Sequence, residues 1–251
     1  MRIILSTILK NMKEMADPRN FPFIFREIYI YFKELLYFKK RYQGSYPLKV
    51  LPVFFEKTAF SPFDPHYTYQ AYWVASQLIK NKTKDNIPHI DISSNVAFIS
   101  QLCAVTEVIQ VEYRPSQLRL SSYHKIAGDI LNLPFSDKSV PSLSCLHVVE
   151  HIGLGRYGDV VDVDGCWKAL SELERILAFG GKLYLSVPIG KPVVFFNGCY
   201  VFCAMDIVRA FADMDLVNFA YVNDDAVFVE SGKPEDTNDL KYGLGLFIFS
   251  K

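Results

Sequence analysis

Short apolar runs alternate with amphipathic stretches along residues 67–251. The runs have the length of buried strands, and the stretches between them place apolar residues at helical spacing. Strands that alternate with helices predict right-handed crossovers and a mostly parallel sheet covered on both faces. The predicted strands are 87–92, 107–112, 124–128, 140–146, 182–188, 216–222 and 243–250, and the predicted helices are 67–80, 96–104, 164–178 and 204–213. No helix separates the last two strands, so an antiparallel pair is expected there.

Residues 21–46 have a different pattern, with ten aromatic side chains among basic ones. Phe25, Ile28, Phe32, Leu35 and Leu36 recur at near-helical spacing, which predicts an amphipathic helix. Such a helix covers a core or forms a lid, or it attaches the chain to a membrane surface or another subunit. We favour a covering helix, because basic amphipathic helices on membranes are the less common case.

The pattern divides the chain into an aromatic and basic N-terminal helical extension, residues 1–66, and an α/β domain, residues 67–251. With 251 residues and 50% hydrophobic residues the chain can bury a sizeable core. The formal net charge of +0 argues against a nucleic-acid partner. The charge is uneven, because residues 1–50 hold 10 Lys and Arg against 4 Asp and Glu.

No apolar run is long enough to span a membrane, although residues 21–46 leave peripheral membrane contact open. The five cysteines are odd in number and mostly lie in apolar surroundings, which favours reduced thiols and a cytoplasmic protein. The sequence does not indicate an oligomeric state.

Acidic residues mark the ends of three successive predicted strands. Asp91 lies at the end of the first strand, Glu112 ends the second strand 21 positions later, and Asp129 ends the third. In open α/β sheets ligands bind beyond the carboxyl ends of the strands. A carboxylate about 20 positions after the first turn is placed to accept both hydroxyls of a ribose, and Asp129 is placed to meet an adenine edge.

Three segments resemble the third, fourth and fifth strand regions of class I S-adenosylmethionine-dependent methyltransferases: AGDILNLPFSD, SCLHVVEHIG and ALSELERILAFGGKLYLSVPIG. The resemblance covers about residues 87–250 and is closest to a bacterial branch known only as a domain of unknown function. It implies a Rossmann-like fold with a mostly parallel seven-stranded sheet, and S-adenosylmethionine as cofactor. Carried over by position, the resemblance implies that Asp91, Ser93 and Asn95 lie beside the methionine moiety. It also implies that Glu112 binds the ribose and that Asp129 and Ile130 contact the adenine.

The turn after the first strand departs from that family's pattern, which has glycines at alternate positions. Ser93, Asn95 and Ala97 occupy these positions. Glycine suits such a turn because the backbone bends tightly and the ligand comes close. Serine is small and asparagine tolerates positive φ, so cofactor binding is compatible with the sequence. Weak binding or a lost cofactor is the alternative.

The segment His147-Val148-Val149-Glu150-His151 follows the fourth predicted strand. In a helix starting there, His147, Glu150 and His151 would share one face. Such a group can transfer a proton or orient a substrate. The same order occurs in inverted zinc-peptidase motifs and resembles a metal site of some methyltransferases, and a helix-capping role is a third interpretation. We take the three residues as candidate catalytic groups and predict no metal site.

Residues 153–158 have the order G-x-G-x-x-G of a dinucleotide motif, but the 147–152 segment separates them from the strand. The motif should lie directly between a strand and a helix. We therefore interpret these residues as a mobile loop over the substrate pocket, with Arg156 and Tyr157 as candidate substrate contacts.

The leading hypothesis is methyl transfer from S-adenosylmethionine to an oxygen or nitrogen of a small molecule or glycan precursor. The alternative is a non-catalytic protein with a methyltransferase-like fold that binds or scaffolds a partner. A metal-dependent hydrolase that uses residues 147–151 is the third hypothesis.

Overall fold

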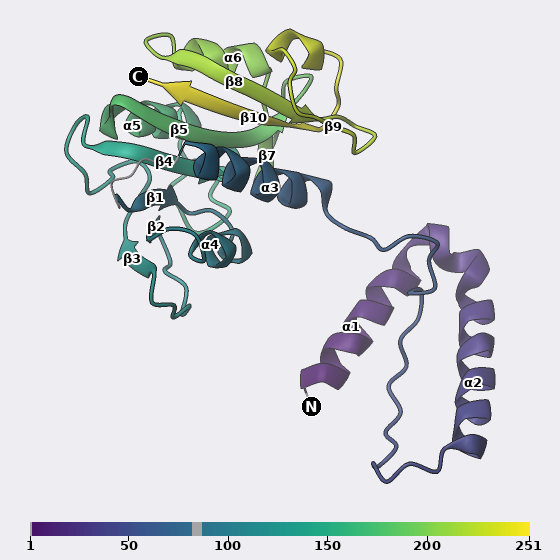
Figure 1. The fold of residues 1–251 in the computed structure, drawn as a ribbon. Helices are drawn as coiled ribbons and strands as arrows, with labels where there is room; N and C mark the ends of the chain where they lie inside the picture. Colours follow the sequence, from purple (N-terminus) through teal and green to yellow (C-terminus); the bar gives the residue numbers. More distant parts are fainter. Residues whose placement is uncertain (1, 82–86) are drawn as a thin grey trace. The chain divides into compact units, whose positions relative to one another are not determined.

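The computed structural model describes residues 2–81 and 87–251. The chain divides into two compact units, Met1–Phe63 and Asp64–Lys251, of which the second contains the sheet (Figure 1). No helix among the described residues is long and apolar enough to cross a membrane. The predicted division into an N-terminal extension, residues 1–66, and an α/β domain, residues 67–251, stays a prediction.

The first unit consists of helices and an extended segment. Its elements are α1 (Arg2–Ala16), the 3-10 helix η1 (Pro18–Phe23) and α2 (Ile24–Arg41). The extended segment contacts both helices: Asn11 of α1 donates to the carbonyl of Pro52 (2.7 Å), and Lys57 pairs with Glu34 of α2 (2.5 Å). The aromatic pattern predicted α2, whereas α1 was not predicted.

An eight-stranded sheet forms the centre of the second unit, in the order β3-β2-β1-β4-β5-β10-β8-β9. The first five strands in this order are parallel, and β10 is antiparallel to both β5 and β8. The strands are β1 (His89–Ile92), β2 (Val108–Glu112), β3 (Tyr123–Ala127), β4 (Val140–Leu146), β5 (Leu177–Ile189), β8 (Asp215–Val222), β9 (Phe228–Val229) and β10 (Gly243–Ser250).

Helices cover both faces of this sheet. On one face α3 and α4 supply Trp73 and Phe98 to the buried cluster, and on the other α5 and α6 supply Leu170 and Ile207. The helices and short helical turns are α3 (Pro65–Lys80), α4 (Val96–Leu102), η2 (Val149–His151), α5 (Gly165–Ile176), α6 (Ala204–Ala210) and η3 (Pro234–Thr237).

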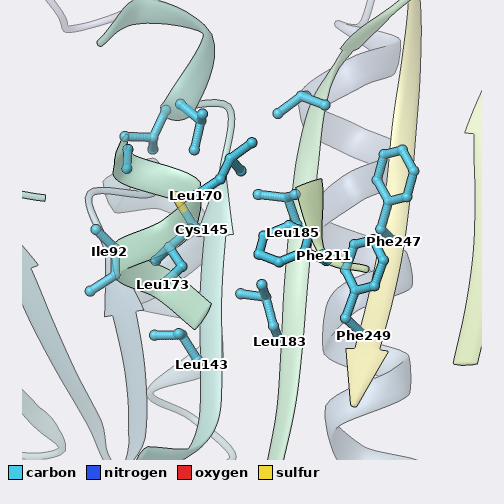
Figure 2. Packing of buried hydrophobic residues seen from close by; sticks show 14 of the residues in the cluster. Ile92, Leu143, Cys145, Leu170, Leu173, Leu183, Leu185, Phe211, Phe247 and Phe249 are labelled. Carbon is cyan, nitrogen blue, oxygen red and sulfur yellow. The ribbon is translucent and has the colours of Figure 1, made fainter. Parts of the chain in front are cut away.

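The larger core lies between the sheet and α5 (Figure 2). Leu170 and Leu173 of α5 pack over β4 and β5, and both are fully buried. Toward β10, the ring of Phe211 lies 4.7 Å from that of Phe249, centroid to centroid. This packing holds the middle strands in register, and the carboxyl ends of β1, β2, β3 and β4 therefore open at one edge of the sheet.

The predicted fold class is confirmed, and so is the antiparallel pairing of the last two predicted strands, β8 and β10. The sheet has eight strands rather than seven because Phe228–Val229 adds β9 beside β8. A separate hairpin of β6 (Val193–Phe195) and β7 (Cys199–Val201) was also not predicted. All three residues of β6 are exposed, so the segment lacks the alternation that marks a half-buried strand.

Candidate functional site

Asp91 lies in β1 and points into the sheet, where it is fully buried. Its Oδ1 accepts hydrogen bonds from the Ser94 amide (3.0 Å) and from Gln110 of β2 (3.1 Å). Its Oδ2 accepts from the Ser144 hydroxyl of β4 (2.6 Å). One carboxylate therefore joins the three central parallel strands and the turn that follows β1.

The hydrogen-bonded chain continues to His89, whose Nε2 lies 2.8 Å from the Ser144 hydroxyl and whose Nδ1 lies 2.8 Å from the Ser142 hydroxyl. Burial lowers the pKa of His89 to about 3, so the ring is neutral. Burial raises the pKa of Asp91 to about 6, against the opposing effect of its hydrogen bonds. Asp91 is thus a structural group of the sheet in this arrangement.

The turn after β1 has its unusual backbone conformation at Ser93, with φ of 55°. The Ser93 amide donates to the carbonyl of Val111 (2.9 Å), and its hydroxyl approaches the same carbonyl (3.3 Å). Asn95 has a negative φ and caps α4, because its Oδ1 accepts from the Ala97 amide (2.7 Å). The left-handed position that favours glycine is therefore occupied by serine rather than by asparagine.

A cavity of about 370 Å³ opens at the carboxyl ends of the parallel strands. Ser93, Glu112 and Asp129 line it, each from the end of a different strand. Ile130 and Tyr113 also line this nucleotide-side cavity. One oxygen of Glu112 accepts from the Arg114 amide (3.2 Å), and an ionised carboxylate keeps further acceptor capacity.

Arg175 of α5 holds the chain segment that follows Asp129 and Ile130. Its guanidinium donates to the carbonyls of Leu133 (3.2 Å) and Phe135 (2.9 Å), and it pairs with Glu172 (2.7 Å). Glu172 in turn accepts from the Leu133 amide (2.7 Å). This clamp fixes one wall of the nucleotide-side cavity to the helix beneath it.

A second cavity, of about 460 Å³, adjoins the first, because His147 and Tyr157 line both. We call it the histidine cavity. Its walls come from the start of α3, from η2, from the β6–β7 hairpin and from the loop before β10. The lining residues include His66, Tyr67, Glu150, His151, Arg156, Cys199 and Tyr242.

His147 and Glu150 form a buried pair at the border of the two cavities. His147 Nδ1 lies 2.5 Å from Glu150 Oε1, and the two side chains are 6% and 0% exposed. If Glu150 is ionised and the imidazole is neutral, the carboxylate only accepts, so Nδ1 carries the proton and Nε2 is left as an acceptor. Among the described residues neither His147 Nε2 nor Glu150 Oε2 has a hydrogen-bond partner. Buried polar atoms without partners are rare and point to a ligand or a catalytic role.

Three aromatic groups surround this pair. The rings of His66 and Tyr67 stack on His147, at centroid distances of 5.5 Å and 5.2 Å. Tyr242 in turn stacks on the ring of His66, at a centroid distance of 5.4 Å. Burial and the neighbouring His147 lower the pKa of His66 to about 4, so His66 is neutral at physiological pH.

His151 lies at the end of the same short turn. Its Nδ1 is 2.7 Å from the carbonyl of Gly198, which also accepts from Arg156 (3.2 Å). Its Nε2 lies 3.8 Å from Glu150. The expected helix is only the 3-10 turn η2, yet Glu150 still lies between His147 and His151. Among the described residues no group of three or more His, Cys, Asp or Glu has a metal-binding arrangement.

The glycine-rich loop, residues 153–158, contributes Gly153 and Tyr157 to the lining of the nucleotide-side cavity. Asp159 organises it, because its carboxylate accepts from the amides of Gly153 (3.1 Å), Gly155 (3.2 Å) and Tyr157 (3.1 Å). Burial opposes the ionised form, but these backbone hydrogen bonds together lower the pKa of Asp159. The Arg114 guanidinium lies over the Tyr157 ring, 5.4 Å from its centroid.

The structure separates the predicted site residues into three groups. Asp91 and Asn95 line neither cavity and serve the sheet and the cap of α4. Ser93, Glu112, Asp129 and Ile130 line the nucleotide-side cavity, whereas His147, Glu150, His151, Arg156 and Tyr157 line the histidine cavity. His147 and Tyr157 belong to both.

Sequence patterns missed His66, Tyr67, Cys199 and Tyr242 as cavity residues. For His66 and Tyr67 the sequence does indicate a local element, because Asp64 and Pro65 mark the start of a helix there. Asp64 does cap α3, accepting from the Tyr67 amide (3.1 Å). Nothing in the spacing indicates that the start of α3 packs beside the turn after β4.

A model of one protein family, described as "Caenorhabditis protein of unknown function, DUF268", matches residues 105–242. This range contains Glu112, Asp129 and the His147–Glu150 pair, and it excludes β1 and the turn at Ser93. The predicted resemblance to a domain of unknown function is confirmed, although the description names Caenorhabditis rather than bacteria. No curated protein matches the chain.

Solved structures of methyltransferases have a similar fold, so the predicted resemblance is confirmed at the level of the fold. Geranyl diphosphate C-methyltransferase from Streptomyces coelicolor A3(2) has a TM-score of 0.53 and 12% identity, over 73% of this chain and 79% of that chain. N-methyltransferase NodS from Bradyrhizobium japonicum WM9, in complex with S-adenosyl-L-homocysteine, has a TM-score of 0.50 and 13% identity, over 74% and 86%. The [4+2]-cyclase SpnF has a TM-score of 0.51 and 10% identity, over 71% and 80%. At these identities the likeness concerns the fold alone.

Replacing Ser93 tests the backbone strain in the first turn. A left-handed conformation costs a non-glycine residue about 1–2 kcal/mol. Ser93→Ala keeps this strain and loses the hydroxyl contact with Val111, whereas Ser93→Gly removes the strain. We expect Ser93→Gly to be more stable than Ser93→Ala by about 1 kcal/mol in urea unfolding. A Ser93→Gly variant that is the less stable of the two would contradict the described turn.

Asp91→Asn tests the buried carboxylate. An acid whose pKa is raised on folding stabilises the fold at low pH, and this contribution is lost as the pH rises from the unfolded value, about 3.9, to about 6. The asparagine cannot titrate and can still hydrogen-bond to Ser144. We expect the unfolding free energy of the parent protein to fall by about 2 kcal/mol relative to that of the variant between pH 4 and pH 7. Parallel pH profiles in urea unfolding would show that Asp91 titrates normally.

Proposed function

Because the chain belongs to the DUF268 family, whose function is unknown, and has the fold of class I methyltransferases, we propose that it is an S-adenosylmethionine-dependent methyltransferase. The observation that carries the proposal is the nucleotide-side cavity, where Ser93, Glu112 and Asp129 meet from three strand ends. Its volume of about 370 Å³ lies within the usual range for ligand pockets, about 300–1,000 Å³.

The chemistry of the cavity walls fits an adenosine. Glu112 has acceptor capacity for the two ribose hydroxyls. Asp129 offers acceptors to the amino edge of an adenine, and the buried side chain of Ile130 offers an apolar surface to the base. The positive φ at Ser93 opens the turn in the way that glycine does in related folds, so the absence of glycine does not by itself close the cavity.

The histidine cavity is where we place the methyl acceptor. Bound S-adenosylmethionine supplies a methyl group on a positively charged sulfur. Glu150 holds the His147 ring and its Nδ1 proton, and Nε2 is then the acceptor for the proton that the methyl acceptor loses. Positioning of the two reactants supplies most of the acceleration in such a transfer, and His147 and Tyr157 border both cavities.

The acceptor in this proposal is a small molecule or a glycan precursor that is methylated on oxygen or nitrogen. The histidine cavity supports this class because both aromatic rings and hydrogen-bonding groups line its wall. His66, Tyr67 and Tyr242 present rings, and Arg156 and His151 present polar nitrogen atoms. Sugars and other polar small molecules bind well to such mixed surfaces, where a few polar groups fix orientation.

A non-catalytic methyltransferase-like protein is the second candidate function. The observation in its favour is the turn after β1, where a strained serine replaces glycine and Asp91 is committed to the sheet. The similarity to a protein described as a [4+2]-cyclase also means that the fold alone does not specify methyl transfer. A metal-dependent hydrolase has less support, since among the described residues no three His, Cys, Asp or Glu side chains have a metal-binding arrangement.

Isothermal titration calorimetry with S-adenosylhomocysteine tests the cofactor site. We expect binding by the parent protein and a loss of at least tenfold in affinity for Glu112→Gln, because the neutral amide is a weaker acceptor for the ribose hydroxyls. Glu107→Gln is the matched control, since Glu107 is exposed and immediately precedes β2 at the opposite end of the strand. Absence of binding at millimolar ligand, or an equal loss in both variants, would refute the proposed site.

The protonation of His147 tests the proposed proton acceptor without a known substrate. Long-range proton–nitrogen NMR distinguishes the two ring tautomers. We expect the His147 proton on Nδ1 in the parent protein and a loss of this preference in Glu150→Met, which keeps the side-chain volume but lacks the carboxylate. His147→Asn identifies the signal, since asparagine tolerates the φ of 56° found there. A proton on Nε2 in the parent protein would contradict the assigned role.

A further inference from the structure

The helix α2 has a stripe of large apolar side chains that no described residue of its own unit, Met1–Phe63, covers. Phe25, Tyr29, Phe32 and Leu36 follow one another at intervals of four, three and four residues, which places them on one face of a helix. All four are exposed, from 84% at Phe25 to 54% at Phe32. A contiguous exposed apolar face of this size marks an interaction surface.

The charges on α2 are segregated around this stripe. Arg26, Lys33 and Lys40 recur every seven residues, which places them along one flank of the stripe. Glu27 and Glu34 lie roughly half a turn away from it, on the opposite face, where Glu34 pairs with Lys57. The surface beside the apolar side chains is therefore positively charged.

The unit that contains α2 gives the stripe no core to cover. Among the described residues of Met1–Phe63 no hydrophobic side chain is buried. The neighbouring helix α1 also exposes Ile8, Leu9 and Met12, by 44%, 58% and 62%. Inside the unit Tyr31 packs edge to face on Phe54, with centroids 5.4 Å apart, and the Phe32 ring touches Tyr31 (5.5 Å) while it stays 54% exposed. Within its own unit the stripe therefore stays exposed.

We propose that α2 lies flat on an anionic lipid bilayer, with Phe25, Tyr29, Phe32 and Leu36 inserted among the lipid chains. Three properties fit this occupant. The helix is amphipathic, its inserted face is largely aromatic, and cations flank that face where lipid headgroups would lie. The acidic side chains point away from the membrane. The proposed attachment is to one surface of the bilayer.

A protein partner or a second copy of the chain fits less well. Either partner could bind an apolar stripe. Neither kind of partner, however, requires that basic residues flank the stripe and that the acidic residues lie on the opposite face of the helix. An anionic membrane surface attracts juxtaposed lysines and arginines, each by an amount that corresponds to about a fivefold change in binding. The proposal does not depend on the proposed catalytic function, because the residues involved lie in the other unit of the chain.

Vesicle cosedimentation of the full chain tests the proposal. The vesicles are phosphatidylcholine alone or phosphatidylcholine with phosphatidylserine. We expect binding to the mixed vesicles and a loss of about tenfold or more for Phe32→Ala, because the burial of a phenylalanine side chain in the lipid is lost. Phe38→Ala is the matched control: Phe38 lies on the same helix with a similar exposure, 51% against 54%, but on the far side from the stripe. We expect less than a twofold change for the control.

The basic flank has its own variant. Replacing Arg26, Lys33 and Lys40 by glutamine should reduce binding to the mixed vesicles at least tenfold and leave any binding to the neutral vesicles unchanged. Circular dichroism verifies that each variant keeps its helical content. Failure of the folded parent protein to bind mixed vesicles would overturn the proposal, as would equal losses in Phe32→Ala and Phe38→Ala. The stripe would instead be assigned to a second copy of the chain if the parent protein does not bind vesicles, is a dimer in light scattering, and becomes a monomer in Phe32→Ala.

Discussion

The carboxylate of Asp91 is the constraint on which the candidate site depends. It is buried between β1, β2 and β4, and it also holds the amide of Ser94 in the turn that follows. A buried carboxylate is costly unless its hydrogen bonds are made, so these partners hold the three strands and the turn in one arrangement. The position of Ser93 at the cavity wall follows from that arrangement. The parallel sheet and the ligand-binding edge are thus linked through one side chain.

Two cavities with different chemistry result from this architecture. The nucleotide-side cavity has carboxylates at strand ends and a wall fixed by Arg175, and the histidine cavity has stacked rings around a buried histidine and glutamate. Rigid strands supply the first set of groups, and turns and loops supply most of the second. The division matches the usual arrangement of α/β folds, in which the scaffold positions a nucleotide and the loops select the other ligand.

Periodicity predicted the order of the sheet because its central strands are short apolar runs between amphipathic helices. The meeting of Glu112 and Asp129 followed from the same pattern, since parallel strands end at one edge. The role of Asp91 could not be predicted, because it depends on Gln110 and Ser144 in other strands. The contact of His66 and Tyr67 with His147 joins segments about 80 residues apart, and local spacing carries no information about such packing. β9 and β6 were missed because they have only two and three residues, and all residues of each strand have the same degree of exposure, so neither shows the alternation of a strand.

The shared wall between the cavities has a thermodynamic consequence. Tyr157 belongs to the loop that Asp159 organises, and it borders both cavities. A ligand that restrains this loop from one side changes the free energy of placing a ligand on the other side. Linkage requires that effect to be reciprocal and equal in size for the two ligands. Coupling between ligands in the two cavities would therefore run through the two residues that border both, Tyr157 and His147, even where the ligands themselves never touch.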